Sequence, residues 1–438
     1  MIVPAYNAAH HLGPCLEALC RSTTAFHEII VVDDGSTDET PGLAARYDVT
    51  VLHTGGRRGP AFARNLGANA ASGEILLFID ADVSVRHDTG DKIRTWFASD
   101  AELAALIGSY DSEPRCPDFL SQYRNLMHHF VHQNGGERAS TFWSGCGAIR
   151  RDIFLEYSGF SEAFGRPAIE DIELGYRLVR AGCKIVLDRD IQVTHAKRWT
   201  FWNLVRTDVL DRGIPWTELI LRDQRMPDDL NLQLSQRVSV ALVFILVALS
   251  GMLAVLWRGY FLVPLIALVF LLLTRWWGEF GHADRPQSAP LVLLAVVALI
   301  IGLAWWHGMV GLIPPLVLSP GLLLLQHRYS HYGSRPKALR WLAALYTCAS
   351  IALAVYYMPH HPVVLAGFTI FAVLGLLNSQ FYLFLAAKRG IPFMLAAVPF
   401  HMLYHFYNGI SFLAGLVLHL RLMPLPAARR DWLRRLLR

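Results

Sequence analysis

The chain has 438 residues, of which 53% are hydrophobic and only 17% are charged, against a charged share of about 25% in typical globular domains. Residues 1–231 contain 24 Lys and Arg against 32 Asp and Glu, whereas residues 232–438 contain 16 against three. The basic residues of the second half stand in short groups between apolar stretches, which favours a membrane-associated region and argues against nucleic-acid binding. The six cysteines show no CxxC or paired spacing, so we expect reduced thiols.

Residues 1–115 alternate short apolar runs with helical patterns. We expect strands at 1–7, 28–36, 49–54 and 74–82, and helices at 11–22, 40–48 and 59–72. Strands that alternate with helices predict a mostly parallel sheet covered on both faces. Polar residues at the carboxyl ends of such strands indicate a ligand crevice there. No cleavable signal is recognised before this α/β domain, so we expect it in the cytoplasm.

The remainder of the first half is less regular. We expect a helix at 118–133, a strand, turn and helix at 145–160, a helix at 169–182 and one or two strands at 184–195. A polar stretch then marks the domain boundary. The predicted organisation is an α/β domain at 1–222, a connector at 223–236, an all-α transmembrane domain at 237–421 and a basic tail at 422–438.

The transmembrane prediction depends on long apolar stretches. Residues 238–257 carry no charge over 20 residues, enough for a helix to cross a hydrocarbon core of about 30 Å. Further candidate spans are 260–274, 289–306, 308–326, 341–358 and 363–385. The stretch 391–420 is predicted to form either a helical hairpin or a helix at the membrane interface. The pattern indicates a multi-pass protein of the inner (plasma) membrane.

Two carboxylates follow the apolar run that ends at Ile79, in the sequence FIDADVS. Asp80 and Asp82 are two positions apart, so an extended chain places them on the same side. Taken alone, the pattern is equally consistent with two solvated acids in a turn. A pair of carboxylates is also what a hard divalent cation requires.

Five stretches, in this order, resemble family 2 glycosyltransferases of the GT-A fold: VPAYN (3–7), VVDDGSTDET (31–40), GPAFARN (59–65), DADV (80–83) and IEDIELGYRL (169–178). The resemblance covers roughly residues 1–220. It implies inverting transfer of a sugar from a nucleotide-sugar donor with the help of a divalent ion, Mg²⁺ or Mn²⁺. The apolar half resembles, in general character, members that act on polyprenyl phosphates or other lipids.

The resemblance also implies roles for single residues. Asp82 would hold the metal, and Asp80 the ribose or the metal. Asp171 would be the general base that takes the proton of the acceptor hydroxyl, with Glu170 in support. The other residues expected to bind the nucleotide-sugar are Pro4, Tyr6, Asn7, Asp33, Asp34, Arg64 and Asn65. An Asx-turn for the acids at 33–34, a surface ion pair for Arg64 and a simple helix-start role for Asp171 are the structural alternatives.

The sequence THAKRW (194–199) permits two interpretations. His195 follows a strand and is a candidate metal ligand. His195, Arg198 and Trp199 also occupy the spacing of the QxxRW motif of processive polysaccharide synthases, with His in place of Gln. Arg198 would then contact phosphate and Trp199 would stack on a sugar, although Trp199 is equally consistent with an anchor at the membrane interface. Arg212 is a candidate ligand for a phosphate of the acceptor.

The sequence therefore predicts a membrane-bound, metal-dependent inverting glycosyltransferase of cell-envelope glycan synthesis. Its partners would be a UDP- or GDP-sugar, a lipid-linked or glycan acceptor and the lipid bilayer. One alternative is a processive polysaccharide synthase with a transmembrane channel. A different class of protein, a non-catalytic membrane transporter that senses nucleotide-sugars, is the second alternative.

Overall fold

The computed structural model describes residues 1–224, 226–227, 232–256, 289–306, 308–318, 345–346, 349 and 362–422. The chain divides into two compact units, one made of Met1–Val240 with Ala397–Arg438 and the other of Ala241–Ala396. The predicted span 260–274, most of the span 341–358 and part of the span 308–326 lie outside the described residues. The basic tail at 423–438 lies outside them as well.

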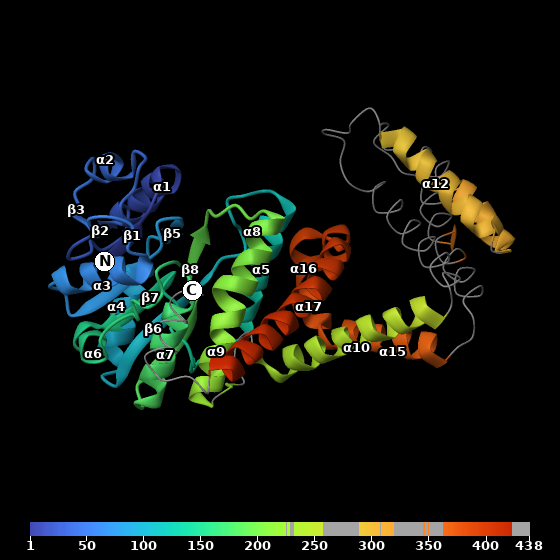
Figure 1. The fold of residues 1–438 in the computed structure, drawn as a ribbon. Coiled ribbons are helices and arrows are strands. Elements are labelled where there is room, and N and C mark those ends of the chain that lie inside the picture. The colour runs from blue at the N-terminus through green and yellow to red at the C-terminus, as the bar shows by residue number, and fades with distance from the viewer. Residues whose placement is uncertain are drawn as a thin grey trace. The chain divides into compact units, whose positions relative to one another are not determined.

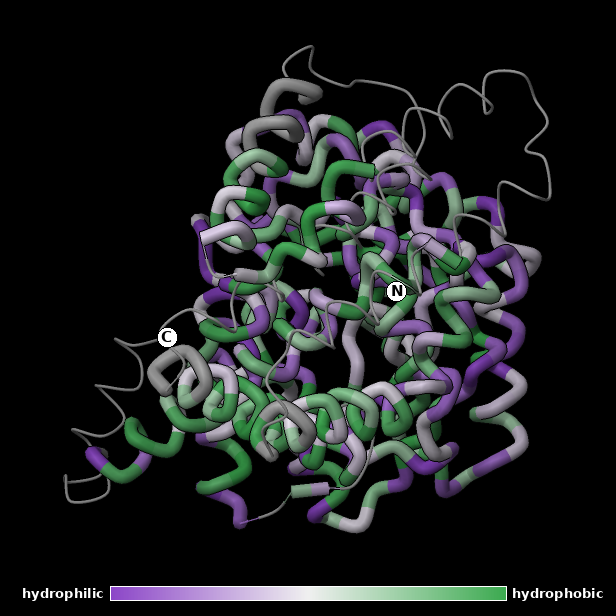
Figure 2. Tube along the Cα trace, turned by 90° about the vertical axis from the view of Figure 1, so that its right-hand side faces the viewer, coloured by the Kyte–Doolittle hydropathy of each residue, from purple (hydrophilic) through white to green (hydrophobic). Residues whose placement is uncertain are grey.

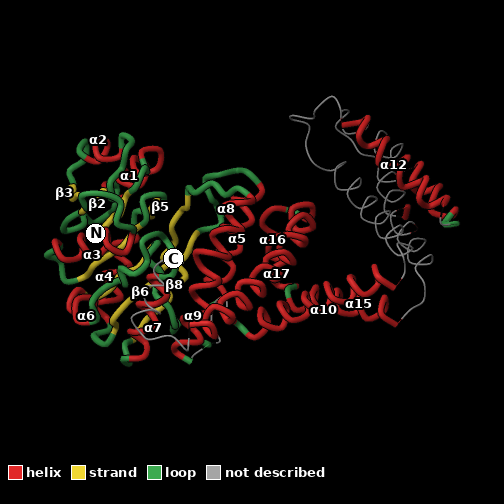
Figure 3. Tube along the Cα trace, in the orientation of Figure 1, coloured by secondary structure: helices red, strands yellow, loops and turns green. Residues whose placement is uncertain are grey.

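The first unit contains an eight-stranded mixed sheet in the order β3-β2-β1-β4-β7-β6-β8-β5 (Figures 1 and 3). Neighbouring strands pair in parallel except at the contacts β4 with β7, β7 with β6 and β8 with β5. The strands are β1 (Ile2–Ala5), β2 (Ile30–Asp33), β3 (Thr50–His53), β4 (Ile75–Ile79), β5 (Val83–Val85), β6 (Leu103–Tyr110), β7 (Cys146–Arg150) and β8 (Lys184–His195). The mostly parallel α/β sheet expected from the sequence is confirmed.

Strands β1 and β4, at the centre of the sheet, are apolar at every position because both of their faces are buried. Val3 and Val31 pack on one face, in the core shared with helix α1 (Ala9–Cys20). Ile2 and Ile30, their immediate neighbours, pack on the opposite face in a core shared with helix α3 (Pro60–Ala70). The alternating side-chain directions of a strand explain this division.

The remaining helices of this unit complete the two layers. They are α2 (Thr40–Ala44), α4 (Thr89–Ser99), α5 (Phe119–Asn134), α6 (Arg151–Glu156), α7 (Glu170–Arg180), α8 (Phe201–Arg206), the π-helix η1 (Thr207–Gly213) and α9 (Ile214–Asp223). The expected elements of residues 1–82 and 118–195 are confirmed. Strands β5 and β6 and helix α4 had no counterpart among the expectations, although β6 is buried at every position.

Helix α17 (Ile391–Leu422) is one continuous helix with Pro399 in its interior, so the expected hairpin at 391–420 does not form. From Ala397 onward it belongs to the same compact unit as the sheet. The rings of Phe400 and Phe119 lie 5.3 Å apart, and the hydroxyl of Tyr407 donates to Asp208 at 2.6 Å. Helix α17 is therefore packed against the α/β domain through apolar and polar contacts.

The described helices of the second unit are strongly apolar. They include most of α10 (Leu234–Leu256), α12 (Ala289–Trp306), α15 (Pro362–Leu377) and α16 (Ser379–Arg389). Within the described residues, Leu234–Met252 is long and apolar enough to cross a membrane, which is weak support for a membrane domain. The span expected at 363–385 is instead bent by 63° between α15 and α16. Figure 2 shows long hydrophobic stretches among segments of mixed hydropathy.

Candidate active site

The loops after β1, β2 and β4 meet at one edge of the sheet, because these parallel strands all end there. They border a cavity of about 300 Å³. Seven residues expected at the nucleotide-sugar site line this cavity: Pro4, Tyr6, Asn7, Asp34, Arg64, Asp80 and Asp82. The structure thus brings together side chains from positions 4 to 82, as the sequence motifs predict.

Tyr6 and Asn7 form one wall of the cavity. Asn7 has a left-handed backbone with a φ of 47°, a conformation that asparagine tolerates better than most residues. Its side-chain oxygen accepts from the backbone amide of Thr37 at 2.8 Å, and its backbone amide donates to Ser36 Oγ at 2.9 Å. The loops after β1 and β2 are therefore fixed to each other. Tyr6 remains 39% exposed, with the Arg57 guanidinium 4.5 Å from its ring centroid.

The two acids after β2 have different surroundings. Asp34 accepts from the backbone amides of Arg58 and Gly59, both at 2.8 Å. Gly59 has a φ of 94°, and a Cβ there would lie 2.7 Å from the carbonyl of Gly165, so only glycine fits. Asp33 does not line the cavity and lies 3.2 Å from His53 Nδ1. Asp34 thus shapes the cavity wall, and contact of either acid with a nucleobase remains a prediction.

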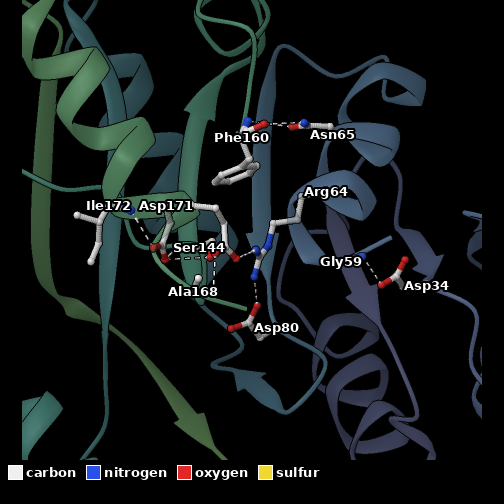
Figure 4. A network of polar contacts seen from close by, with 11 residues as sticks. Asp34, Gly59, Arg64, Asn65, Asp80, Ser144, Phe160, Ala168, Asp171 and Ile172 are labelled. Atoms are coloured by element: carbon white, nitrogen blue, oxygen red, sulfur yellow. Dashed lines mark hydrogen bonds and ion pairs between the residues drawn. The ribbon is translucent and has the colours of Figure 1, made fainter. Parts of the chain in front are cut away.

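Arg64 joins two carboxylates that are distant in the sequence (Figure 4). Its Nη2 donates to Asp80 at 2.7 Å and its Nη1 donates to Glu170 at 2.9 Å. Arg64 and Glu170 are both buried. Burial raises the pKa of Glu170 and of Asp80, while the charge of Arg64 opposes the increase at both acids. The surface ion pair considered for Arg64 is in fact a buried ion pair, and its contact with donor phosphate remains a prediction.

Asn65, the next residue, does not line the cavity. Its side-chain amide donates to the carbonyl of Phe160 at 2.8 Å, and its oxygen accepts from the amide of Phe160 at 2.9 Å (Figure 4). Asn65 therefore holds the loop that precedes α7. The structure assigns it this positional role, and its expected contact with the donor remains a prediction.

Asp82 and His195 lie side by side because Val83, the first residue of β5, pairs with His195, the last residue of β8. His195 Nε2 is 3.6 Å from Asp82 Oδ2, and its ring stacks on Tyr110 with a centroid distance of 4.3 Å. Burial would raise the pKa of Asp82, but the interaction with the nearby His195 and the charge of Lys197 outweigh it and lower that pKa to about 2. Asp82 is therefore ionised at neutral pH.

The residues at this edge fit a divalent cation. Carboxylate oxygens and an imidazole nitrogen are suitable ligands for Mn²⁺, and the pKa of Asp80 is raised by burial and by the charge of Asp82 beside it, a repulsion that a cation between the two carboxylates would relieve. Among the described residues no group of three or more His, Cys, Asp or Glu is arranged to hold an ion. Ions bound with nucleotides commonly use one or two carboxylates together with phosphate oxygens and water. This small set of protein ligands is therefore compatible with an ion that binds together with the nucleotide-sugar.

Asp171, the expected base, lies in the first turn of α7, and hydrogen bonds from Ser144 and Ile172 orient its carboxylate. Its Oδ2 accepts from both the amide and the hydroxyl of Ser144, each at 3.1 Å, and its Oδ1 accepts from the amide of Ile172 at 2.8 Å (Figure 4). A carboxylate has about four acceptor positions. Three are used within the described chain, which leaves one on Oδ1.

The residues expected to bind the acceptor are not gathered in one place. Arg198 is exposed, and Trp199 is 4% exposed in a small core with Leu204 and Tyr407. Neither residue lines the cavity of about 300 Å³. Arg212 lines a second cavity of about 60 Å³, whose other walls include Arg124, His128, Asp208, Trp216, Tyr404 and Asn408.

Three further residues at the site were not singled out by the motifs. Arg57 and Lys197 line the larger cavity, and Ser144 orients Asp171. Lys197 stands inside the motif THAKRW, so its position was a usable signal, but the spacing directed attention to its neighbour Arg198. Ser144 gave no signal, because its role depends on a contact with a residue 27 positions away.

Comparisons with known proteins show what this chain is similar to. Residues 1–158 match the model of the family "Glycosyl transferase family 2". The chain is 25% identical over 238 residues to an O-antigen chain rhamnosyltransferase of Salmonella typhimurium, a match that covers 50% of this chain and 74% of that protein. It is 28% identical over 228 residues to a validoxylamine A glucosyltransferase of Streptomyces hygroscopicus, covering 43% of this chain and about half of that protein (53%).

A solved structure of a mannosyltransferase from Pyrobaculum calidifontis, in complex with GDP-Man and Mn²⁺, is 18% identical with a TM-score of 0.42, over 94% of this chain and 86% of that one. The family match and the curated relatives place the protein in the class of glycosyltransferases. Residues 1–158 form a domain of glycosyltransferase family 2. Together with the mixed sheet, this supports the expected GT-A domain and favours an enzyme over a non-catalytic sensor.

Proposed function

We propose that the chain is a membrane-bound, metal-dependent inverting glycosyltransferase that moves a sugar from a UDP- or GDP-sugar to a lipid-linked or glycan acceptor. The observation that carries this proposal is the Arg64 guanidinium bonded to both Asp80 and Glu170. Glu170 precedes Asp171, so this contact ties the acids at the end of β4 to the expected base. The donor cavity and the base are thereby parts of one charged cluster.

In the proposed reaction, an acceptor hydroxyl attacks the anomeric carbon of the donor from the face opposite the diphosphate. A new bond forms between the acceptor oxygen and this carbon, and the bond between the carbon and the diphosphate oxygen breaks with its electron pair leaving on the nucleoside diphosphate. The proton of the hydroxyl passes to Asp171. The free acceptor position on Oδ1 of Asp171, left by the contacts with Ser144 and Ile172, is suited to receive it.

Asp82 and His195, with Asp80 beside them, are the residues proposed to hold Mg²⁺ or Mn²⁺, which when bound would neutralise charge on the diphosphate. The lowered pKa of Asp82 keeps its carboxylate ionised at neutral pH. Stacking on Tyr110 fixes the plane of the His195 ring. Arg64 holds Asp80 in place. Its positive charge also compensates the repulsion between the carboxylates of Asp80 and Glu170.

The smaller cavity is the proposed anchor for an anionic group of the acceptor. Arg212 makes no hydrogen bond or ion pair within the described part of the chain, whereas Arg124 pairs with Asp208 at 2.5 Å. A half-buried cation without a partner favours an anion nearby. Trp216 borders this cavity and packs in the small core with Ile169 and Ile172, which flank the base. If this cavity holds a phosphate of a lipid-linked acceptor, the part of the acceptor next to that phosphate would lie toward Asp171.

The alternative of a processive synthase receives less support. The motif that suggested it requires a tryptophan open to a sugar, and Trp199 is buried against Leu204 and Tyr407. We therefore favour single transfer of a sugar. The expected location is the inner membrane with the α/β domain in the cytoplasm, supported by the apolar helix Leu234–Met252 and the basic groups of the second half.

The test uses the full chain purified in detergent with UDP- and GDP-sugars, Mn²⁺ and polyprenyl phosphate as probe acceptor. We expect nucleoside diphosphate release that depends on the acceptor and stops with excess chelator. Asp171→Asn should lower kcat about 10²- to 10⁴-fold while donor binding, measured by calorimetry, stays within a few-fold. Asp190→Asn, an exposed aspartate outside the site, is the matched control. Unchanged turnover in Asp171→Asn, or full activity without metal, would contradict the proposal.

A further inference from the structure

The segment after β8 is held in a fixed backbone conformation beside the larger cavity. The amide of Ala196 donates to the carbonyl of Asp82 at 2.8 Å, and the carbonyl of Ala196 accepts from Cys116 Sγ at 3.2 Å. Three residues later, the amide of Trp199 donates to Ser121 Oγ at 2.8 Å. Both ends of the segment 196–199 are therefore attached to the α/β domain, which sets the direction of the side chains between them.

The side chains of Lys197, Arg198 and Trp199 have different surroundings. Trp199 is buried in the core with Leu204, and Arg198 is exposed and does not line the cavity. Lys197 is the one that lines the cavity, together with Asp80 and Asp82. A basic residue is thus present at the donor site, one position before the arginine that the motif spacing indicated.

The basic residues of the cavity differ in how far they are already engaged. Arg64 is bonded to Asp80 and Glu170, and Arg166 pairs with Asp211 at 2.9 Å. Arg57 lies over the ring of Tyr6. Lys197 has neither a hydrogen bond nor an ion pair within the residues that the structure describes, and its Nζ lies 4.3 Å from the centroid of the Trp199 ring. An aromatic face stabilises the charge of an ammonium group and leaves its N–H donors unused.

Within the described residues, none of the carboxylates that line the cavity forms a hydrogen bond or ion pair with Lys197. Asp82 and Asp80 attract the ammonium group through their charge, but each is engaged elsewhere, Asp82 with His195 and Asp80 with Arg64. A half-buried ammonium with three free donors is satisfied best by an anionic oxygen from a ligand. The cavity volume of about 300 Å³ leaves room for such a group.

We infer that Lys197, and not Arg198, binds a diphosphate oxygen of the nucleotide donor and stabilises the charge that this diphosphate gains as it leaves. The inference rests on the proposed function. It identifies a donor-binding residue that the family motifs do not indicate, and it explains why the motif arginine is left on the surface. Trp199 would then act through Lys197, as the aromatic face that holds the ammonium group over the cavity.

The inference is tested by binding of UDP and GDP to the full-length protein, measured by calorimetry with and without Mn²⁺. Lys197→Gln should weaken binding of the preferred nucleotide about 10- to 100-fold, as expected for a lost hydrogen bond to a charged group, in both conditions. Arg198→Gln is the matched control and should stay within about twofold. Lys197→Arg, which keeps the charge, should recover most of the affinity.

Two results separate the failure of this inference from the failure of the proposed function. If the unaltered protein binds neither UDP nor GDP, the proposed function fails. If it binds one of them while Lys197→Gln binds equally well, or if Arg198→Gln shows the loss instead, only the inference fails. Binding of Mn²⁺ without nucleotide should not weaken in Lys197→Gln, because the ammonium group of Lys197 repels the metal ion. Weaker Mn²⁺ binding would show that the substitution distorts the site, and the loss of nucleotide binding would then not support the inference.

A measurement on the unaltered protein covers the case in which Lys197→Gln does not fold. Amine-selective acylation followed by mass spectrometry reports how accessible each lysine is. Saturating nucleoside diphosphate should reduce labelling of Lys197 severalfold and leave Lys92 unchanged, because Lys92 pairs with Asp88 away from the cavity. Equal labelling of Lys197 with and without nucleotide would overturn the inference.

Discussion

The two cavities of the first unit are built in contrasting ways. The larger one lies at the edge of the sheet and is lined by residues between positions 4 and 197, with Asp34, Asp80 and Asp82 among them. The smaller one is lined by residues of α5, η1, α9 and α17, and two of its arginines face a single aspartate, Asp208. Besides its basic side chains the larger cavity has a pair of carboxylates, Asp80 and Asp82. The smaller one has a single carboxylate, and its Arg212 makes no ion pair within the described residues.

This difference indicates how the two substrates are separated. A pair of carboxylates suits a diphosphate when a cation accompanies it, whereas a guanidinium group without an ion-pair partner binds an anion directly. Helix α5 borders the smaller cavity through His128, whose ring packs edge-on against Tyr110, and Tyr110 in turn stacks on His195, the proposed metal ligand. Four substitutions test the contrast, from the largest expected effect to the smallest.

Arg64→Met tests the charge balance of the larger cavity. It leaves the buried Glu170 and the partly exposed Asp80 without their shared partner, and the uncompensated burial of Glu170 should cost about 3–5 kcal/mol of unfolding free energy. Thermal unfolding of the full chain measures the loss, and Arg46→Met, at an exposed position, is the control. Adding Glu170→Gln to Arg64→Met should restore part of the stability. A double variant no more stable than the single one would show that the ion pair is not the cause.

His132, on α5 beside the ring of Trp143, tests whether the helix that borders the smaller cavity is sensitive to acid. Burial, and to a lesser degree the charge of His129, lowers the pKa of His132 from 6.5 to about 4. Between pH 6.5 and 4 the unfolded chain therefore binds a proton that the folded chain does not. The free energy of unfolding decreases as the pH is lowered through this window, by about 3 kcal/mol for this group.

His132→Phe should remove that part of the acid sensitivity. The measurement is the difference in Tm between pH 7 and pH 5, which should be smaller in the variant than in the unaltered protein. His10→Phe, at an exposed position, serves as the control and should keep the full difference. An identical pH dependence in His132→Phe would show that His132 is not the group that titrates.

Tyr407→Phe tests the attachment of α17 to the smaller cavity. It removes the hydroxyl that donates to the buried Asp208 at 2.6 Å, and we expect a loss of about 1.5–3 kcal/mol, as for other hydrogen bonds to charged groups. Hydrogen exchange should show weaker protection in α17 and η1 than in α7. Tyr47→Phe, which removes a longer bond of 3.4 Å, should have a smaller effect. Uniform loss of protection across all helices would argue against a local role.

Arg212→Gln tests the smaller cavity as the anchor of the acceptor. The KM for polyprenyl phosphate should rise about tenfold, since one charged contact is lost, while the KM for the donor stays unchanged. Arg206→Gln, at an exposed position six residues earlier, is the control. A rise in donor KM alone would assign Arg212 to the larger cavity and remove the contrast between the two.

The larger cavity could be predicted because its signals are local. The apolar runs of β1, β2 and β4 each end in polar residues, and parallel strands bring such ends together without further information. The same reasoning could not detect β6, a run of eight residues without a motif at its end. Asn65 and Trp199 also behaved differently from the expectation, because their partners Phe160 and Tyr407 are distant in sequence.

Of the smaller cavity, only Arg212 was expected from the sequence, as a candidate ligand for an acceptor phosphate. Asp208 and Tyr407 are 199 positions apart, and no periodicity in either segment indicates that they meet. The sequence pattern of α17 is that of an apolar helix, which is equally suited to a membrane or to a protein core. Only the folded chain shows that part of this helix packs against the α/β domain.

The packing of α17 has a practical consequence for fragments of this enzyme. A protein shortened to residues 1–222 would keep the side chains around the larger cavity but lose Tyr404, Tyr407 and Asn408. Asp208 would then be uncovered on the side where the Tyr407 hydroxyl now lies. Such a fragment should serve for crystallising nucleotide complexes, whereas inhibitor screens aimed at the acceptor would need the intact polypeptide.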